Sequence, residues 1–339
     1  MTTLLPSGRP SDRPSGAAPG ANQIIGLDIG GTKILGVLLA DDDAVLSSVR
    51  LPTVRGLDGV VATAAAAVRA LLDAAGTELS AIAGIGIGVP GVVDPRGGTV
   101  SHAVNLDLPA GATPLARLLS AALAGVPVRA ENDLNVAALG VAHVGVADAS
   151  DAGPTPDLAF LALGTGIAAG LLLDGQLRRG AFGAAGEIGH IPFVADGPLC
   201  ACGQHGCLEL YASGASIDAR WAGAGAGAGP APAALFAAAL AGDRDAVRVR
   251  DEFVLAVAAA VRILVLTTDV RCVVLGGGVS ELGAPLLEAV VGALEAQAVG
   301  SAFLASLGIG GRVRLAPPGV PVAAIGAALL ARGTVAAWK

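Results

Sequence analysis

One histidine and three cysteines constrain the local fold more than any other feature of this chain. His190, Cys200, Cys202 and Cys207 fall within eighteen residues. Together they can supply four ligands to one tetrahedral metal ion, and a mixed His/Cys set selects zinc. Three buried cysteines and a core histidine are the alternative, which the C-x-C-x₄-C spacing disfavours. Since a Cys₃His set normally leaves no open coordination position, we expect structural Zn²⁺ rather than a catalytic metal.

Two acidic residues flank this predicted zinc loop, which spans residues 190–209. Glu187 precedes it within Gly186-Glu187-Ile188-Gly189-His190, and Glu209 closes it. A metal at this position would fix a loop that carries two carboxylates. We therefore expect the zinc loop to shape a binding pocket.

Composition narrows the class of protein. The chain has 339 residues, enough for two domains, and its 50 glycines and 3% aromatic residues fit a tightly packed α/β protein. The net charge of −7 argues against a nucleic-acid surface. No basic segment followed by an apolar one opens the chain, and no long apolar run lacks glycine or proline, so we expect no membrane partner and a cytoplasmic location without disulfides.

An apolar strand from residue 24 ends in Asp28-Ile29-Gly30-Gly31-Thr32-Lys33, and a second strand follows. This strand–turn–strand pattern is neither a Walker loop nor a dinucleotide fingerprint, because each of those motifs leads directly into a helix. Gly30 and Gly31 permit a phosphate to approach backbone N–H groups, while Thr32 and Lys33 add a hydroxyl and a charge. Asp28 is placed to hold hydrated Mg²⁺. Ordinary hairpin chemistry also uses such a sequence.

The same pattern recurs later in the chain. Strands are expected at 158–163 and 167–173, joined by Gly164-Thr165-Gly166, which suggests a duplicated phosphate clamp. A further strand ends in glycines that include Gly277 and Gly278, where a flat ligand such as adenine or ribose can lie on the backbone.

Two polar sites have both a structural and a functional interpretation. Asp133, within Glu131-Asn132-Asp133, stands where a strand meets a helix, so it is either a helix N-cap or a general base beside a hydroxyl-binding Asn132. Both interpretations hold if Asn132 provides the cap. Asn105 is either a turn residue or a hydroxyl-binding amide.

These motifs together resemble the ROK family (repressors, open reading frames and kinases), most closely its bacterial glucokinase-type sugar kinases. The resemblance covers nearly all of the chain after residue 22 and rests on the first turn, Glu131-Asn132-Asp133, Gly164-Thr165-Gly166 and the zinc loop with its upstream glycines. It implies an α/β, two-domain actin/hexokinase-like (ribonuclease H-like) ATPase fold with an interdomain cleft.

The resemblance also implies domain limits and residue roles. Residues 23–130 would be a small domain joined by a C-terminal helix at 322–339, and 131–321 a large domain. For residues 1–22, the composition rich in Pro, Ser, Gly and Ala predicts a disordered tail. Asp133 would take the proton from the attacking sugar hydroxyl. The sugar hydroxyls would be held by Asn105, Asn132, Asp133, Glu187, His190 and Glu209. ATP with Mg²⁺ would be held by Asp28, Gly30, Gly31, Thr32, Lys33, Gly164, Thr165, Gly166, Gly277 and Gly278.

The implied activity is ATP-dependent phosphorylation of a hexose, foremost glucose to glucose 6-phosphate, by a homodimer or homotetramer. An N-acetylmannosamine or other hexose kinase is the nearest alternative, and a non-catalytic sugar sensor or repressor is the alternative from another class. Ala168 and Ala169 replace glycines that the family often has after the second turn, which leaves the sensor alternative open. Only about 22 proline-rich residues precede the first phosphate motif, too few for the DNA-binding domain that such repressors carry.

Overall fold

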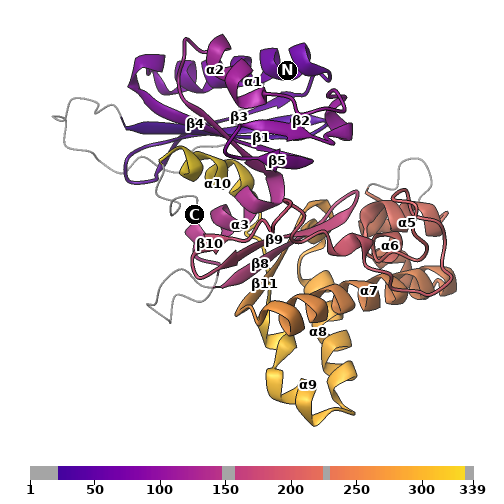
Figure 1. The fold of residues 1–339 in the computed structure, drawn as a ribbon. Helices are drawn as coiled ribbons and strands as arrows, with labels where there is room; N and C mark the ends of the chain where they lie inside the picture. The colour runs from indigo at the N-terminus through magenta and orange to yellow at the C-terminus, as the bar shows by residue number, and fades with distance from the viewer. Residues whose placement is uncertain (1–21, 147–156, 224–229, 333–339) are drawn as a thin grey trace. The chain divides into compact units, whose positions relative to one another are not determined.

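The structure is a computed structural model that describes residues 22–146, 157–223 and 230–332. The predicted tail at 1–22 lies outside these ranges except for Asn22. Contacts divide the chain into two compact units, which Figure 1 draws as a ribbon. The first unit consists of the chain up to Val144, the segment Gly180–Ala184 and the chain from Pro321 onward. The second unit consists of Gly145–Arg179 and Ala185–Val320.

The limit between the units falls one helix later than the sequence suggests. Helix α3 (Asp133–His143) belongs to the first unit, whereas the predicted boundary lies before it, at residues 130 and 131. The cause is its packing against α10 (Val322–Ala331), the C-terminal helix. A Cβ at Gly140 would lie 1.8 Å from the carbonyl oxygen of Val322, and one at Gly326 would lie 1.8 Å from that of Val136, so the two backbones are in direct contact.

A five-stranded sheet in the order β3-β2-β1-β4-β7 organises the first unit. Strands β1, β2 and β3 are antiparallel neighbours, whereas β4 runs parallel to both β1 and β7. The strands span Gln23–Ile29 (β1), Lys33–Leu39 (β2), Val45–Pro52 (β3), Ile82–Val89 (β4) and Val128–Asn132 (β7). A small hairpin is formed by Val92–Asp94 (β5) and Thr99–Ser101 (β6).

Both faces of this sheet are covered by helices. One face packs on α1 (Leu57–Ala75) and α2 (Leu115–Ala122), as its buried apolar cluster shows. The other packs on α10, where Ile24, Val37 and Leu39 meet Ala324 and Ala328 (Figure 1). Two short 3₁₀ turns, η1 (Leu79–Ala81) and η2 (Val104–Leu106), complete the unit.

The second unit repeats the strand arrangement of the first. Its sheet has the order β10-β9-β8-β11-β12, with β8 antiparallel to β9 and parallel to β11, and β11 parallel to β12. The strands span Leu158–Leu163 (β8), Ile167–Leu173 (β9), Gln176–Leu177 (β10), Cys272–Gly276 (β11) and Val313–Leu315 (β12). Each unit therefore contains a hairpin with a glycine turn, as the repeated sequence pattern predicts. In both units the first strand of this hairpin also has a parallel neighbour.

The remaining elements of the second unit are mainly helical. They are η3 (Ile188–His190), α4 (Glu209–Ala212), α5 (Gly214–Arg220), α6 (Ala231–Leu240), α7 (Arg244–Thr268), η4 (Gly278–Leu282), α8 (Ala284–Ala298), α9 (Ala302–Leu307) and η5 (Ile309–Arg312). Helix α7 buries much of its length in the main apolar cluster. In none of the helices within the described ranges do length and apolar character suffice for a membrane span.

Replacing Gly140 with alanine should destabilise the first unit, because its Cβ would meet backbone rather than a movable side chain. We expect a loss of roughly 2 kcal/mol or more in urea unfolding, as for overpacked cores. Gly292 is the matched control, since it also lies inside a helix but has open space where its Cβ would stand. Gly292→Ala should gain about 0.5–1 kcal/mol from helix propensity. Equal stability of the two variants would contradict the close packing of α3 and α10.

Candidate functional site

Within the first unit, the paired strands β1, β4 and β7 end together, and acidic groups from β1 and β7 lie at this edge of the sheet. The register aligns Asp28 of β1 with Gly88 of β4, and Gly88 with Glu131 of β7. Asp133 follows at the start of α3, and its Cα lies 3.5 Å from where a Cβ of Gly88 would stand. Because Gly88 has no side chain, α3 packs closely on β4 here, with Val136 Cγ2 2.5 Å from the position of a Gly88 Cβ.

The carboxyl group of Asp28 has a perturbed pKa. Burial, and after it the negative charge of Asp133, raise this pKa from the ordinary value of 3.8 to about 7, against the opposing effect of Lys33. Two carboxylates at this partly buried edge favour a bound cation, because a cation offsets both desolvation and mutual repulsion. These residues therefore fit the predicted Mg²⁺, which Asp28 would hold.

The question of whether Asp133 is a helix cap or a base is answered in part by Asn132. The Oδ1 of Asn132 accepts the N–H groups of Leu134 and Asn135, at 3.0 and 3.3 Å, so Asn132 is the N-cap of α3. Asp133 is the first residue of the helix, where its Oδ1 also accepts the Leu134 N–H at 3.0 Å. The Nδ2 of Asn132 donates to the carbonyl of Gly91 at 3.1 Å, which leaves one of its two hydrogens for a ligand.

Glu131 is a residue that the sequence reasoning did not assign to the site. Its side chain is 1% exposed, and its Oε1 accepts the N–H of Asn132 and the Nδ2 of Asn135, both at 2.9 Å. A buried carboxylate with these partners fixes the start of α3 and hence the position of Asp133. Its signal in the sequence was an acidic residue at the last buried step of a strand, just before a helix.

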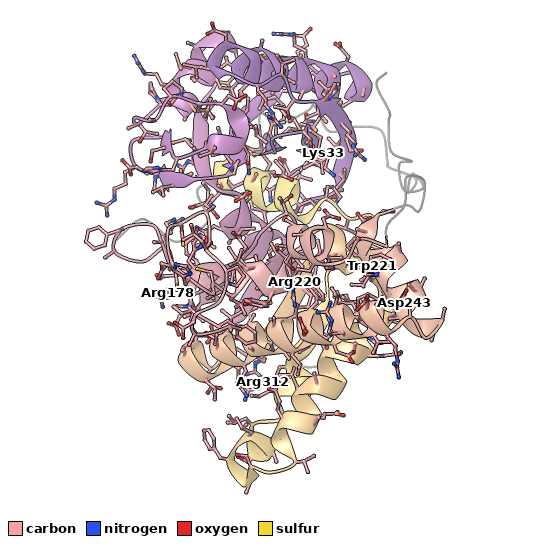
Figure 2. All side chains as sticks on the ribbon, turned by 90° about the vertical axis from the view of Figure 1, so that its right-hand side faces the viewer. Lys33, Arg178, Arg220, Trp221, Asp243 and Arg312 are labelled. Carbon is pink, nitrogen blue, oxygen red and sulfur yellow. The ribbon has the colours of Figure 1, made fainter. Side chains whose placement is uncertain are left out.

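The first glycine turn lies beside Asn105. A Cβ on Gly31 would stand 2.6 Å from the carbonyl oxygen of Asn105, so the turn and η2 touch through their backbones. Asn105, Thr32 and Lys33 are exposed, and Lys33 marks the start of β2 in Figure 2. Among the first-unit residues predicted for the site, the structure thus joins the turn to Asn105 and Asp28 to Asp133.

In the second unit, the four predicted zinc ligands come together. One ligand atom from each of His190, Cys200, Cys202 and Cys207 lies within 4.8 Å of the others. The sulfurs of Cys202 and Cys207 are 3.6 Å apart, close to the roughly 3.8 Å that two Zn–S bonds of ~2.3 Å subtend in a tetrahedron. The Nδ1 of His190 faces Cys200 at 3.9 Å, which leaves its Nε2 for another partner. The geometry and chemistry of this set fit zinc.

The thiols show why a cation suits this cluster. Hydrogen bonds from the backbone and side chain of Gln204 lower the pKa of the Cys202 thiol to about 6. Burial, followed by the neighbouring thiols, raises the pKa of Cys207 to about 12. Several thiolates this close repel one another unless a cation lies among them, and a thiol that coordinates zinc loses its proton.

The segment before the zinc loop packs on β9 through its two glycines. A Cβ at Gly186 would lie 1.8 Å from the carbonyl oxygen of Ala169, and one at Gly189 would lie 2.3 Å from that of Ile167. Glu187, between them, is exposed. The spacing of this motif thus follows from backbone contact with the strand that leaves the second turn.

Glu209 also lies against the second turn. Its Oε2 accepts the N–H of Ile167 at 3.2 Å and stands 2.3 Å from where a Cβ of Gly166 would be. On the other side of this turn, Gly277 packs on Leu163, with a Cβ position 2.5 Å from the carbonyl oxygen of that residue. The structure therefore gathers the second turn, Glu209 and Gly277, and Gly278 follows with open space at its Cβ position.

Aromatic and ionic contacts link the zinc loop to neighbouring helices. Phe193 meets Tyr211 edge-on at 5.6 Å between ring centroids. The guanidinium of Arg220 lies 5.0 Å from the centroid of the Tyr211 ring and forms an ion pair with Glu252 of α7. Figure 2 shows Arg220 beside Trp221 at the end of α5. The loop thus contacts Tyr211 of α4, and Arg220 links that residue to α5 and α7.

The model of the ROK family matches residues 24–334. The chain belongs to the ROK family. A glucokinase from Streptomyces coelicolor is 38% identical over 193 residues, which are 57% of this chain and 57% of that relative. The chain thus aligns with just over half the length of that relative.

Two solved structures of the family extend the similarity to almost the whole chain. The ROK hexokinase of Thermus thermophilus is 34% identical, with a TM-score of 0.72, over 91% of this chain and 97% of that one. A ROK family glucokinase from Streptomyces griseus, in complex with glucose and AMPPNP, is 32% identical, with a TM-score of 0.72, over 92% and 99%. The predicted actin/hexokinase-like ATPase fold is confirmed by this similarity.

Replacing Asp28 with asparagine should remove a pH dependence of stability. Because the pKa of Asp28 in the folded protein lies above 3.8, its stabilising contribution is complete below about pH 4 and is lost as pH rises towards 7. The wild-type protein should therefore lose stability relative to Asp28→Asn over that range and not beyond it, by at most on the order of 4 kcal/mol. Urea unfolding in Mg²⁺-free buffer from pH 4.5 to 8 measures this. Parallel curves would contradict the environment described for Asp28.

Replacing Cys202 with serine should lower the zinc content of the purified protein well below about one ion per chain, because one of four ligands is lost. Elemental analysis after exposure to a mild chelator measures this, and sugar binding by calorimetry is a second readout, since His190 would lose its fixed orientation. Cys272→Ala is the control, because Cys272 is buried in β11 outside the cluster. Full zinc occupancy in the Cys202→Ser protein would remove Cys202 from the ligand set.

Proposed function

We propose that this chain is an ATP-dependent hexose kinase, with glucose as the first substrate to test. The observation that carries this proposal is the pair of Asp28 and Asp133 at the carboxyl ends of the parallel strands β1, β4 and β7, beside a glycine turn. Family membership and the similarity to ROK hexokinase and glucokinase structures support it. The whole protein's activity and substrate are part of the proposal.

Phosphoryl transfer requires positioning and neutralisation of charge more than covalent chemistry by the protein. Asp133 would accept the proton of the attacking sugar hydroxyl, held in place by the Asn132 cap and by buried Glu131 beneath it. Mg²⁺, when bound with ATP, supplies neutralisation of the phosphate charge, and Asp28 would hold it. The backbone N–H groups of the two glycine turns would bind phosphate oxygens.

The zinc loop would orient sugar-binding groups. With Nδ1 of His190 directed at the cysteine cluster, Nε2 is the ring nitrogen that would meet a hydroxyl. Asn105, Asn132, Glu187 and Glu209 are the other proposed sugar contacts. The proposal also includes Mg²⁺ and zinc as bound metals. It further includes a cytoplasmic location and assembly as a homodimer or homotetramer.

Ala168 and Ala169, which depart from the common family pattern, lie in strand β9. They pair with Ala162 and Leu161 of β8, so their methyl groups belong to the sheet rather than to the Gly164–Gly166 turn. Their position supports catalysis over the sensor alternative, because the turn expected to bind phosphate keeps both glycines.

The deciding experiment is release of ADP from Mg-ATP with glucose, mannose, fructose, N-acetylglucosamine and N-acetylmannosamine in turn. Turnover of one sugar would establish the kinase and its substrate, and turnover of N-acetylmannosamine in preference to glucose would select the alternative kinase. Sugar binding in a thermal-shift assay without any turnover would contradict the kinase proposal and favour a sensor.

Replacing Asp133 with asparagine should lower kcat about 10²- to 10⁴-fold, the usual contribution of a general base. Sugar affinity should stay within about threefold, because asparagine keeps an acceptor for the Leu134 N–H and a polar group of the same shape. Asp73→Asn, exposed on α1, is the matched control with the same loss of charge. Substantial turnover in the Asp133→Asn protein would exclude Asp133 as the base.

A further inference from the structure

One backbone N–H group at the start of α3 is shared by two side chains. The nitrogen of Leu134 lies 3.0 Å from the Oδ1 of Asn132 and also 3.0 Å from the Oδ1 of Asp133. Asparagine and aspartate are both strong helix N-caps, so the sequence Asn132-Asp133 places two capping side chains in succession. Of these two, Asp133 is also the proposed base.

The side chain of Asn132 is fixed at the cap by further contacts. Its Oδ1 also accepts the N–H of Asn135 at 3.3 Å, and its Nδ2 donates to the carbonyl of Gly91 at 3.1 Å. Its own backbone N–H donates at 2.9 Å to the Oε1 of Glu131, whose side chain is 1% exposed. Asn132 can therefore hold the Leu134 N–H without a contribution from Asp133.

A second task is proposed for Asp133, and it competes with capping. The proton of the sugar hydroxyl would pass to its carboxylate while the hydroxyl oxygen bonds to the terminal phosphorus and ADP leaves with the electron pair of the broken P–O bond. An Oδ1 that accepts the Leu134 N–H is directed at the helix. If this oxygen turns towards a sugar hydroxyl, the Leu134 N–H stays paired, because Asn132 still accepts it.

We propose that Asn132 is a positioning residue for the base: by accepting the Leu134 N–H, it releases the carboxylate of Asp133 from helix capping for proton transfer. The inference rests on the proposed kinase function, and it gives Asn132 a role beside its proposed contact with a sugar hydroxyl. Without the Asn132 acceptor, Asp133 would become the cap, and its use as a base would require breaking its bond to Leu134.

Replacement of Asn132 by alanine and by serine gives a matched pair of variants. Both lose the amide that meets Gly91 and would meet the sugar, but serine can still cap the helix. With Mg-ATP and the sugar substrate, kcat of Asn132→Ala should fall roughly 2- to 30-fold, the change in an equilibrium constant that loss of a cap produces. Asn132→Ser should recover most of this loss in kcat, whereas KM for the sugar should rise equally in both variants.

A double-mutant cycle in urea tests the competition without catalysis. Asp133→Ala should change the unfolding equilibrium constant about fivefold more in the Asn132→Ala protein than in the wild type, because Asp133 would have become the cap there. In the Asn132→Ser protein, Asp133→Ala should have the same effect as in the wild type. The effect of the Asp133 charge on Asp28 is common to all three backgrounds and cancels from the cycle.

Two results would overturn the proposal. Additive effects of Asn132→Ala and Asp133→Ala on unfolding would show that the two side chains do not compete for the Leu134 N–H. Equal kcat values for Asn132→Ala and Asn132→Ser would reduce Asn132 to a sugar contact. If the wild-type protein phosphorylates no sugar of the panel, the kinase function fails, and the cycle still decides whether Asn132 relieves Asp133 of the cap.

Discussion

Direct contact between backbones, at positions without side chains, is the constraint on which both units depend. In the first unit, Cβ atoms at Gly26 and Gly86 would lie 1.9 and 1.7 Å from carbonyl oxygens of α10, which therefore lies flat on the sheet. In the second, Gly186 and Gly189 bring the segment before the zinc loop onto β9. Such contacts leave no tolerance for a methyl group, and they fix the spacing of elements that carry the polar groups of the site.

The positions of the polar groups depend on this packing, because pairing with the neighbouring strands fixes where each strand ends. Asp28 cannot shift along β1 without breaking its register with Gly88 of β4, and Glu131 is held by the same strand from the other side. The absence of a side chain at Gly88 then allows the start of α3, with Asp133, to lie close to β4. The proposed catalytic role of Asp133 would therefore depend on three adjacent strands and not on the local sequence alone.

Motifs whose residues are close together in the chain could be predicted from the sequence, whereas contacts between distant segments could not. The clustering of His190 with the three cysteines was predictable because these residues are near neighbours in the chain. The two hairpins were predictable because glycine turns separate apolar strands. The sequence shows a 3₁₀ turn such as η4, between β11 and α8, less clearly, because it has no hydrophobic period of its own. The sequence could not show that α3 packs against α10, because the glycines in contact, Gly140 and Gly326, are far apart in the chain.

Glu209 illustrates how one residue can belong to two parts of the site. It follows Cys207 by two positions, so a metal bound to that cysteine restrains the start of α4. Its carboxylate at the same time accepts the N–H of Ile167, directly after the Gly164–Gly166 turn. A carboxylate in contact with a turn that is to bind phosphate opposes the anion unless the hydrogen bond to Ile167 or a sugar hydroxyl takes up its charge. Zinc would then have a role beyond shaping a loop, because it would keep Glu209 where its charge is partnered, and the second turn would depend on a metal that touches neither substrate.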